Sequence, residues 1–375
     1  MGALELLSGD AQTFIEKVWA SRIHVHHARP SDVARLLSLA DVDQLLTSSA
    51  LRTPALRIAQ DGEVLPAIRF TRHATIAGSP LTGLVDGRKV LDLFDGGATV
   101  VLQGLHRYWP PLGLLIRELE AELGHPCQAN AYLTPPGSQG FALHKDTHDV
   151  FVFQTHGRKE WELHDDAGAH HVTMEPGVSM YLPTGTPHAA RTQRDVSLHV
   201  TIGINQVTWR NALGRVVDAV LDAGDLDGHL PAGYLDDQAD FAAGLSARLR
   251  AIADDLERVD AAAAARTEAE RFLTTRTSNL TGGLVDRLAV GEIDADSTVV
   301  RRPGSVCVLV SGRDALRVLL GDRELQVPAY LEPALVWLRT QDELRPADLG
   351  PWLDPQSSLV LVRRLVREGL LQVRS

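Results

Sequence analysis

Four side chains with the chemistry of a metal site lie close together in the chain: His144, Asp146, Lys159 and His188. Two imidazoles and one carboxylate on one face of a metal leave its other positions open, as in non-haem Fe(II) sites. A nearby cation can hold the far carboxylate of 2-oxoglutarate, while O₂ takes a remaining position. The sequence therefore predicts Fe(II) held by His144, Asp146 and His188, with Lys159 pairing to 2-oxoglutarate.

The spacing of the residues indicates how strands could present these ligands. The segments around residues 140–146 and 150–154 have the pattern of strands separated by a short polar turn. Side chains alternate faces along a strand, so His144 and Asp146 are expected on one face and Lys145 on the other. His188 follows a turn-rich segment, and the alternating residues 196–204 predict a further strand.

Lys159 is expected on the apolar face of a strand together with Trp161 and Leu163, while Glu160 and Glu162 take the opposite face. An ammonium group without a partner is costly to bury, so Lys159 needs an anion beside it. A co-substrate carboxylate would meet that need.

Simpler explanations exist for each residue taken alone. A His-x-Asp pair arises often by chance, a buried lysine often pairs with a neighbouring acid, and the chain has 15 histidines. The conjunction of all three features favours the metal site. The remaining nearby histidines are expected in loops or packing: His148, His156, His164, His170, His171 and His199. Of these, His148 and His199 stay open as further candidates.

Three stretches of the sequence closely resemble one known family. They are residues 130–161, with Asn-Ala-Tyr-Leu-Thr-Pro-Pro-Gly at their start, residues 182–188 (Leu-Pro-Thr-Gly-Thr-Pro-His) and residues 197–201 (Ser-Leu-His-Val-Thr). The chain is similar here to the JmjC-type ribosomal oxygenases of the cupin-4 group. Those enzymes use Fe(II), 2-oxoglutarate and O₂ to hydroxylate an arginyl or histidyl side chain of a ribosomal protein.

The resemblance implies roles for individual residues. His144, Asp146 and His188 match the iron ligands, Lys159 matches the base that pairs with the 2-oxoglutarate C5 carboxylate, and Asn130 and Tyr132 match positions lining the co-substrate pocket. Two features depart from the family pattern. Gly203 stands where some relatives have a serine that helps to bind 2-oxoglutarate. The loop after His188 carries Arg191 and Arg194, which match no family position.

The resemblance also implies an α+β fold with a double-stranded β-helix core of the jelly-roll, cupin or JmjC type. Residues 1–208 are expected to form the catalytic domain, with the metal-binding core at about residues 127–207, where short strands and Gly/Pro turns predominate. A helical region, residues 209–277, and a winged-helix-like domain, residues 278–375, would follow. Amphipathic helices are predicted at residues 31–46, capped by Ser31, and at residues 110–123.

The helical region carries an apolar stripe at heptad-like intervals, formed by Leu245, Leu249, Ile252, Leu256 and Val259. Spacing alone favours packing of this stripe within the chain, whereas the resemblance implies a homodimer, because relatives dimerise through this region. Farther on, strands are expected near residues 306–310 and 324–327, and helices at residues 332–338, 346–352 and 357–368.

The winged helix suggests DNA binding through Arg363, Arg364 and Arg367, but residues 331–375 carry equal numbers of basic and acidic side chains. A winged helix without a basic face is more often a packing or protein-interaction module, so nucleic acid is not the expected partner.

Composition sets broad limits. A length of 375 residues and 44% hydrophobic content fit a folded protein of two or three domains. Cys127 and Cys307 show no metal-binding or disulfide spacing, which suits a reducing cytoplasm. We expect no signal peptide and no membrane span. The net charge of −11 suits either plain solubility or attraction of a basic partner such as a ribosomal protein segment.

Two other functions stay open from the sequence. The chain could be a 2-oxoglutarate hydroxylase of a small molecule or a biosynthetic peptide. It could also be a non-enzymatic metal-binding cupin or winged-helix regulator, which would bind a metal without affinity for 2-oxoglutarate.

Overall fold

The structure, a computed structural model, describes residues 2–138, 143–165, 168–191, 195–312 and 315–374. It divides into two compact units. Unit 1 is the chain up to Gln206 with two short returns, Asn279–Thr281 and Arg302–Gly304. Unit 2 holds the remaining segments: Val207–Ser278, Gly282–Arg301 and Ser305–Ser375. The predicted three-part division of the chain stays a prediction.

An eight-stranded antiparallel sheet forms the centre of unit 1, in the order β1-β12-β9-β14-β7-β6-β2-β3. Its strands are β1 (His24–His27), β2 (Leu56–Gln60), β3 (Glu63–Val64), β6 (Thr99–Leu102), β7 (Cys127–Thr134), β9 (Asp149–Gly157), β12 (Val178–Leu182) and β14 (Ser197–Ile204). The strand expected at residues 196–204 is thus confirmed as β14. Because β1, β2, β3 and β6 precede residue 127, the sheet extends well beyond the predicted core of residues 127–207.

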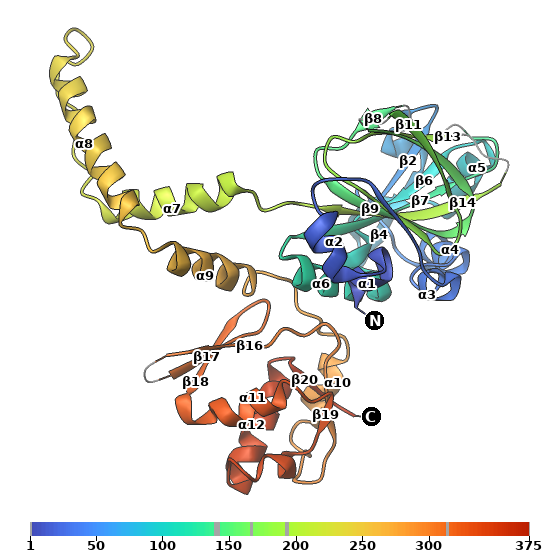
Figure 1. The fold of residues 1–375 in the computed structure, drawn as a ribbon. Helices are drawn as coiled ribbons and strands as arrows, with labels where there is room; N and C mark the ends of the chain where they lie inside the picture. The colour runs from blue at the N-terminus through green and yellow to red at the C-terminus, as the bar shows by residue number, and fades with distance from the viewer. Residues whose placement is uncertain (1, 139–142, 166–167, 192–194, 313–314, 375) are drawn as a thin grey trace. The chain divides into compact units, whose positions relative to one another are not determined.

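A smaller antiparallel sheet, in the order β11-β10-β13-β8, faces the larger one (Figure 1). Its strands are β8 (His144–Lys145), β10 (Lys159–Asp165), β11 (Gly168–Met174) and β13 (Pro187–Arg191). Val150 and Val152 of the larger sheet pack against Trp161 and Leu163 of the smaller one. Strand β9 is buried on both faces, since its Phe151 belongs to the main core on the other side. A separate hairpin joins β4 (Thr71–Ile76) to β5 (Ser79–Val85).

Six α-helices lie in the described part of unit 1, and the main hydrophobic core joins several of them to the larger sheet. They are α1 (Ala3–Ser8), α2 (Ala11–Lys17), α3 (Pro30–Ala34), α4 (Leu39–Ser48), α5 (Gly87–Asp95) and α6 (Pro110–Leu123). Figure 1 shows α1, α2 and α6 gathered beside the strands. Helix α6 confirms the helix predicted at residues 110–123; it begins at a proline and ends before Gly124 in the left-handed conformation.

The single helix predicted for residues 31–46, capped by Ser31, was wrong. The structure has two helices there, α3 and α4, and Ser38 starts the second one. The Ser38 side chain accepts from the Asp41 N–H while the Asp41 carboxylate accepts from the Ser38 N–H. This reciprocal capping box forces a new helix start at Ser38.

Unit 2 begins with three helices, α7 (Trp209–Ala223), α8 (Ala239–Glu257) and α9 (Ala261–Phe272). The remaining elements are α10 (Gly283–Ala289), α11 (Glu332–Leu338), α12 (Pro355–Arg367), β15 (Val299–Arg301), β16 (Val308–Ser311), β17 (Ala315–Leu319), β18 (Glu324–Pro328), β19 (Glu343–Leu344) and β20 (Leu371–Val373). The strand at residues 315–319 was not predicted, and the helix expected at residues 346–352 is a shorter 3₁₀ turn, Pro346–Leu349. Across the described ranges, no helix has the length and apolar content needed to cross a membrane.

Gly157, at the end of β9, provides a test of the strand packing. Its φ is +66°, and a Cβ built there would lie 1.8 Å from the Val196 carbonyl oxygen. Gly157→Ala should therefore destabilise unit 1 by roughly 3 kcal/mol or more, measured by urea denaturation, because backbone must move.

Gly124→Ala is the matched control, since φ is +71° there but no atom lies within 4 Å of the added Cβ. It should cost only the left-handed strain of about 1–2 kcal/mol. Equal losses in the two variants would show that the contact with Val196 is unimportant.

Candidate metal centre

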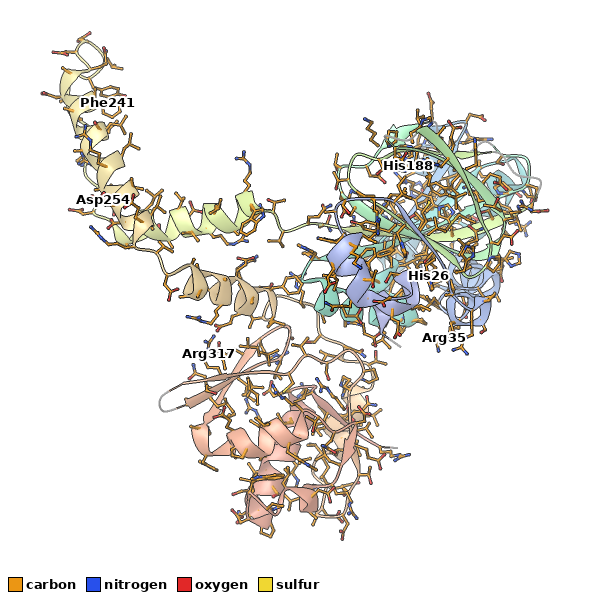
Figure 2. All side chains as sticks on the ribbon, in the orientation of Figure 1. His26, Arg35, His188, Phe241, Asp254 and Arg317 are labelled. Atoms are coloured by element: carbon orange, nitrogen blue, oxygen red, sulfur yellow. The ribbon has the colours of Figure 1, made fainter. Side chains whose placement is uncertain are left out.

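The smaller sheet brings the three predicted ligands together. The possible ligand atoms of His144, Asp146 and His188 all lie within 4.8 Å of one another. His188 Nε2 is 3.6 Å from Asp146 Oδ2, and the two imidazole ring centroids are 4.3 Å apart. His188 lies among the strands of unit 1 in Figure 2 and is buried, whereas His144 is exposed. One side of the cluster is therefore enclosed and the other open.

Strand pairing explains this convergence. In the smaller sheet Leu163 of β10 pairs with His188 of β13, and His188 pairs with His144 of β8. Residues paired across antiparallel strands project to the same face, so both imidazoles point to the face that Leu163 buries. Asp146 was expected within the same strand as His144; the structure ends β8 at Lys145, and Asp146 follows it. The Asp146 carbonyl instead accepts from the Gly185 N–H at 3.0 Å.

The protonation of His188 suits metal binding. Its Nδ1 lies 2.9 Å from the Thr186 carbonyl oxygen, which can only accept, so Nδ1 carries the proton. That leaves the lone pair of Nε2 on the side of Asp146. Burial lowers the pKa of His188, with smaller opposing effects from the Thr186 hydrogen bond and Asp146. The ring is thus a neutral donor at neutral pH.

A cavity of about 250 Å³ lies beside the three residues. Its lining comes from both sheets and consists of Arg57, Tyr132, His144, Asp146, Val150, Val152, Lys159, Trp161, His188, Ala190, His199 and Thr201. The volume suits a small co-substrate rather than a macromolecule. Its place between the sheets gives it a low-dielectric wall on the inner side.

Lys159 lines the cavity from β10 and is only 3% exposed. Trp161 and Leu163 are buried beside it, while Glu160 and Glu162 are half-buried, as the alternation predicted. Lys159 Nζ donates to Thr134 Oγ1 at 3.2 Å, and within the described ranges no carboxylate lies at ion-pair distance from it. Burial lowers its pKa to about 8. A bound carboxylate would supply the missing counter-charge.

Tyr132 also lines the cavity and stacks on His199, with ring centroids 4.9 Å apart and an angle of 5° between the planes. Asn130, two residues earlier on β7, accepts a hydrogen bond from the Gly104 N–H through Oδ1 and is not part of the described cavity lining. The predicted roles of Asn130 and Tyr132 in co-substrate binding stay predictions.

Three polar or aromatic lining residues, Arg57, Trp161 and His199, were not among the predicted site residues. His199 was assigned to packing, yet it is buried at the cavity wall, and burial holds its pKa well below the usual value. Its Nδ1 and Trp161 Nε1 are buried without a hydrogen-bond partner in the described part of the chain. The alternation along residues 196–204 was the available signal for His199, because it places His199 on the same face as Thr201, which also lines the cavity. Nothing in the sequence marks Arg57, which reaches the cavity from β2.

Two features that departed from the family pattern can be placed only in part. A Cβ on Gly203 would lie 2.6 Å from His148 Nε2, so the absence of a side chain leaves room for His148. Arg191 ends β13, and Arg194 lies outside the described residues.

Comparison with known proteins identifies the strand core. Residues 115–172 and 165–212 match the JmjC domain family. These residues include the metal-ligand cluster, Lys159, all four strands of the smaller sheet and four of the eight strands of the larger one.

Curated relatives carry oxygenase names. A Branchiostoma floridae protein called bifunctional lysine-specific demethylase and histidyl-hydroxylase NO66 is 36% identical over 154 residues, covering 39% of this chain and 25% of that protein. Human ribosomal oxygenase 1 is 29% identical over 208 residues, which are 50% of this chain and 31% of that protein. Bovine ribosomal oxygenase 1 is 37% identical over 231 residues, which are 56% of this chain and 33% of that protein. The chain thus spans about a quarter to a third of the length of these relatives.

A solved structure has a similar fold. The Escherichia coli ribosomal oxygenase YcfD, in complex with cobalt and 2-oxoglutarate, covers 97% of this chain and 98% of its own, with a TM-score of 0.55 and 18% identity. The cupin-type fold, with its mixture of helices and sheets, is therefore common to both.

The buried charge of Lys159 is expected to lower the stability of the folded protein. Lys159→Met keeps an unbranched apolar side chain and removes the ammonium, so it should stabilise the metal-free protein at pH 7. The gain should be at most about 3.5 kcal/mol, at ~1.4 kcal/mol per unit of pKa shift. Urea denaturation of both proteins measures it.

The pH dependence has a definite sign. Because the pKa of Lys159 is lowered on folding to about 8, the unfolded state binds more protons between pH 8 and the ordinary lysine pKa. Across that window the free energy of unfolding of the wild type should rise relative to that of Lys159→Met. The difference between the two proteins should therefore disappear. A difference in unfolding free energy that stays constant across this window would show that folding does not lower the pKa of Lys159.

Proposed function

Because residues 115–212 form a JmjC domain, we propose that this chain is an Fe(II)- and 2-oxoglutarate-dependent oxygenase that hydroxylates an amino-acid side chain of a ribosomal protein. The observation that carries the proposal is the cavity that joins His144, Asp146 and His188 to a buried lysine without a described acid partner. Similar proteins named histidyl-hydroxylase and ribosomal oxygenase support the same activity.

The donor set fits the metal. Two imidazoles and one carboxylate from one side leave the opposite positions free, and the cluster is open on the side of His144. When bound, Fe(II) and 2-oxoglutarate would supply the oxidative chemistry together with O₂, releasing succinate and CO₂. His144, Asp146 and His188 hold the metal, and the Thr186 carbonyl fixes the tautomer of His188.

The cavity residues have a separate task, which is to bind and orient the co-substrate. Lys159 pairs with the C5 carboxylate of 2-oxoglutarate, and the buried ring nitrogens of Trp161 and His199 offer further polar contacts. Apolar Val150 and Val152 line the same cavity and keep water from it. Tyr132 and Asn130 are proposed to support this pocket from β7.

A basic ribosomal protein segment is the proposed substrate, modified at an arginyl or histidyl side chain. The chain carries a net charge of −11, which attracts basic partners over long range. Relatives named histidyl-hydroxylase and ribosomal oxygenase support this class. The corresponding location is the cytoplasm, and both Cys127 and Cys307 are free thiols.

A homodimer formed through α7 and α8 is proposed as the assembled state. Neither helix has a buried residue, although α8 carries the predicted apolar stripe; Figure 2 labels Phe241 and Asp254 along this helix. Leu245 and Leu249 are 46% and 57% exposed, and Trp209 at the start of α7 is 84% exposed. A second copy of the chain would cover this apolar surface.

The C-terminal part of unit 2 is proposed to be a winged-helix-like protein-interaction module rather than a DNA reader. Two arginines of α12 are engaged by the protein itself: Arg363 donates to the Gly291 carbonyl, and Arg364 pairs with Glu368. With two of its three arginines engaged in this way, α12 presents little free basic surface of the kind that phosphate contacts require.

Two other functions would give different results in the same assay. A hydroxylase of a small molecule or biosynthetic peptide would bind metal and 2-oxoglutarate but leave ribosomal proteins unmodified. A regulatory metal-binding cupin would bind metal without 2-oxoglutarate.

Anaerobic titration tests the activity directly. Fe(II) with 2-oxoglutarate should give the weak visible charge-transfer band of the chelate, and His188→Ala should lose it together with metal binding. Lys159→Ala should keep metal binding and weaken 2-oxoglutarate by roughly tenfold or more, as removal of a charged hydrogen bond costs about 1.5–3 kcal/mol. Metal binding without the band in wild type would reject the oxygenase in favour of the regulatory cupin.

The dimer is tested by light scattering after size-exclusion chromatography. Leu249→Glu places a charge in the exposed apolar stripe and should convert a dimer to a monomer. Ala247→Glu adds the same charge on the opposite face of α8 and should leave the dimer intact. A wild-type monomer, or equal dissociation in both variants, would reject the proposed interface.

A further inference from the structure

Asp149 is a buried carboxylate at the start of β9 that no step above uses. It is 2% exposed, and within the described ranges no cation lies at ion-pair distance from it. Its charge is instead met by four hydrogen bonds. Oδ1 accepts from the Thr184 N–H and the Thr184 hydroxyl, both at 2.7 Å, and from the Gln206 amide; Oδ2 accepts from the Tyr181 hydroxyl. A carboxylate that accepts this many hydrogen bonds fixes the position of the segments that carry its donors.

The donors belong chiefly to the turn between β12 and β13, residues 183–186. Two of the four bonds come from Thr184, and Gln206 also donates to the Thr184 hydroxyl at 2.7 Å. Tyr181 lies just before the turn and is itself held by the Ala20 N–H at 3.0 Å. Asp149 therefore fastens this turn to the buried end of β9.

The same turn contacts two of the three metal ligands. The Gly185 N–H donates to the Asp146 carbonyl at 3.0 Å, which holds the ligand that lies beyond the end of β8. The Thr186 carbonyl accepts from His188 Nδ1 at 2.9 Å and sets the direction of Nε2. Thr184, which donates two hydrogen bonds to Asp149, directly precedes Gly185 and Thr186 in the chain.

We propose that Asp149 is a positioning residue for the metal centre: through Thr184 it sets the turn that orients Asp146 and His188 together. It touches neither the metal ligands' donor atoms nor the cavity, so its effect is on the geometry of the ligand set. Residues that hold metal ligands in place in this way commonly contribute 10–100-fold to metal affinity. The inference rests on the metal site of the proposed function but not on the oxygenase activity.

The test uses the full chain and Co(II), whose visible absorption reports the number and geometry of its ligands. Asp149→Asn preserves shape and removes the charge, and it should raise the Co(II) dissociation constant by about 10–100-fold and alter the band shape. Thr184→Val is a milder change that keeps the backbone N–H, and it should weaken Co(II) by a smaller factor. The double variant should be no weaker than Asp149→Asn alone, because both changes act through one turn.

Glu120→Gln is the matched control. Glu120 is likewise a buried carboxylate in unit 1, and it accepts from the Cys127 N–H at 2.9 Å, in a contact between α6 and β7. This variant should lose thermal stability comparably and bind Co(II) as wild type does, which separates positioning from general destabilisation.

Three outcomes would overturn the assignment. Asp149→Asn and Thr184→Val could both bind Co(II) within twofold of wild type with an unchanged spectrum. Glu120→Gln could weaken Co(II) as much as Asp149→Asn. The effects of the Asp149 and Thr184 changes could be fully additive. If the wild type itself bound no Co(II), the metal site would be rejected. That result would contradict the proposed function rather than the role of Asp149.

Discussion

The register of three short strands is the constraint on which the site depends. Leu163, His188 and His144 are paired in a row across β10, β13 and β8. Because side chains alternate along a strand, a slip of one residue in β13 would turn His188 to the opposite face of the sheet. The buried side of this row, with Leu163 completely enclosed, fixes the register through packing. The metal ligands thus inherit their direction from the hydrophobic core between the sheets.

Charge is arranged around that core at a cost in stability. Burial holds His188 and His199 neutral and lowers the pKa of Lys159 to about 8, so the unliganded cavity contains a cation in an unfavourable setting. Such a site gains most when an anion enters, because the anion relieves the cost as well as making a new bond. Asp149 shows the opposite solution, in which four donors from the protein satisfy a buried charge permanently. A buried charge whose hydrogen bonds all come from the protein is suited to hold a turn in place. A buried charge without a counter-charge in its site is suited to bind a ligand of opposite charge.

The two units use apolar residues differently. In unit 1 the apolar faces of the strands are covered within the chain by the opposing sheet and by helices. In unit 2 the α10–α12 and β15–β20 portion has its own core, while α7 and α8 bury nothing within the chain. Helices that stand without a core depend on contacts from elsewhere for their stability, since helix propensity alone is marginal.

The sequence by itself determined the ligand types, the alternation that buries Lys159 with Trp161 and Leu163, the limits of α6 and the family resemblance. These are local or motif-level properties, encoded in neighbouring residues. Only the tertiary structure decided which distant residues share the cavity: Arg57 arrives from β2 and His199 from β14, on strands whose positions depend on long-range pairing. It also placed the N-terminal strands in the larger sheet, split the helix predicted at residues 31–46 at the Ser38 cap, and joined Asp149 to the turn before His188. Hydrogen bonds between residues far apart in the chain leave no periodic pattern, so folding alone reveals them.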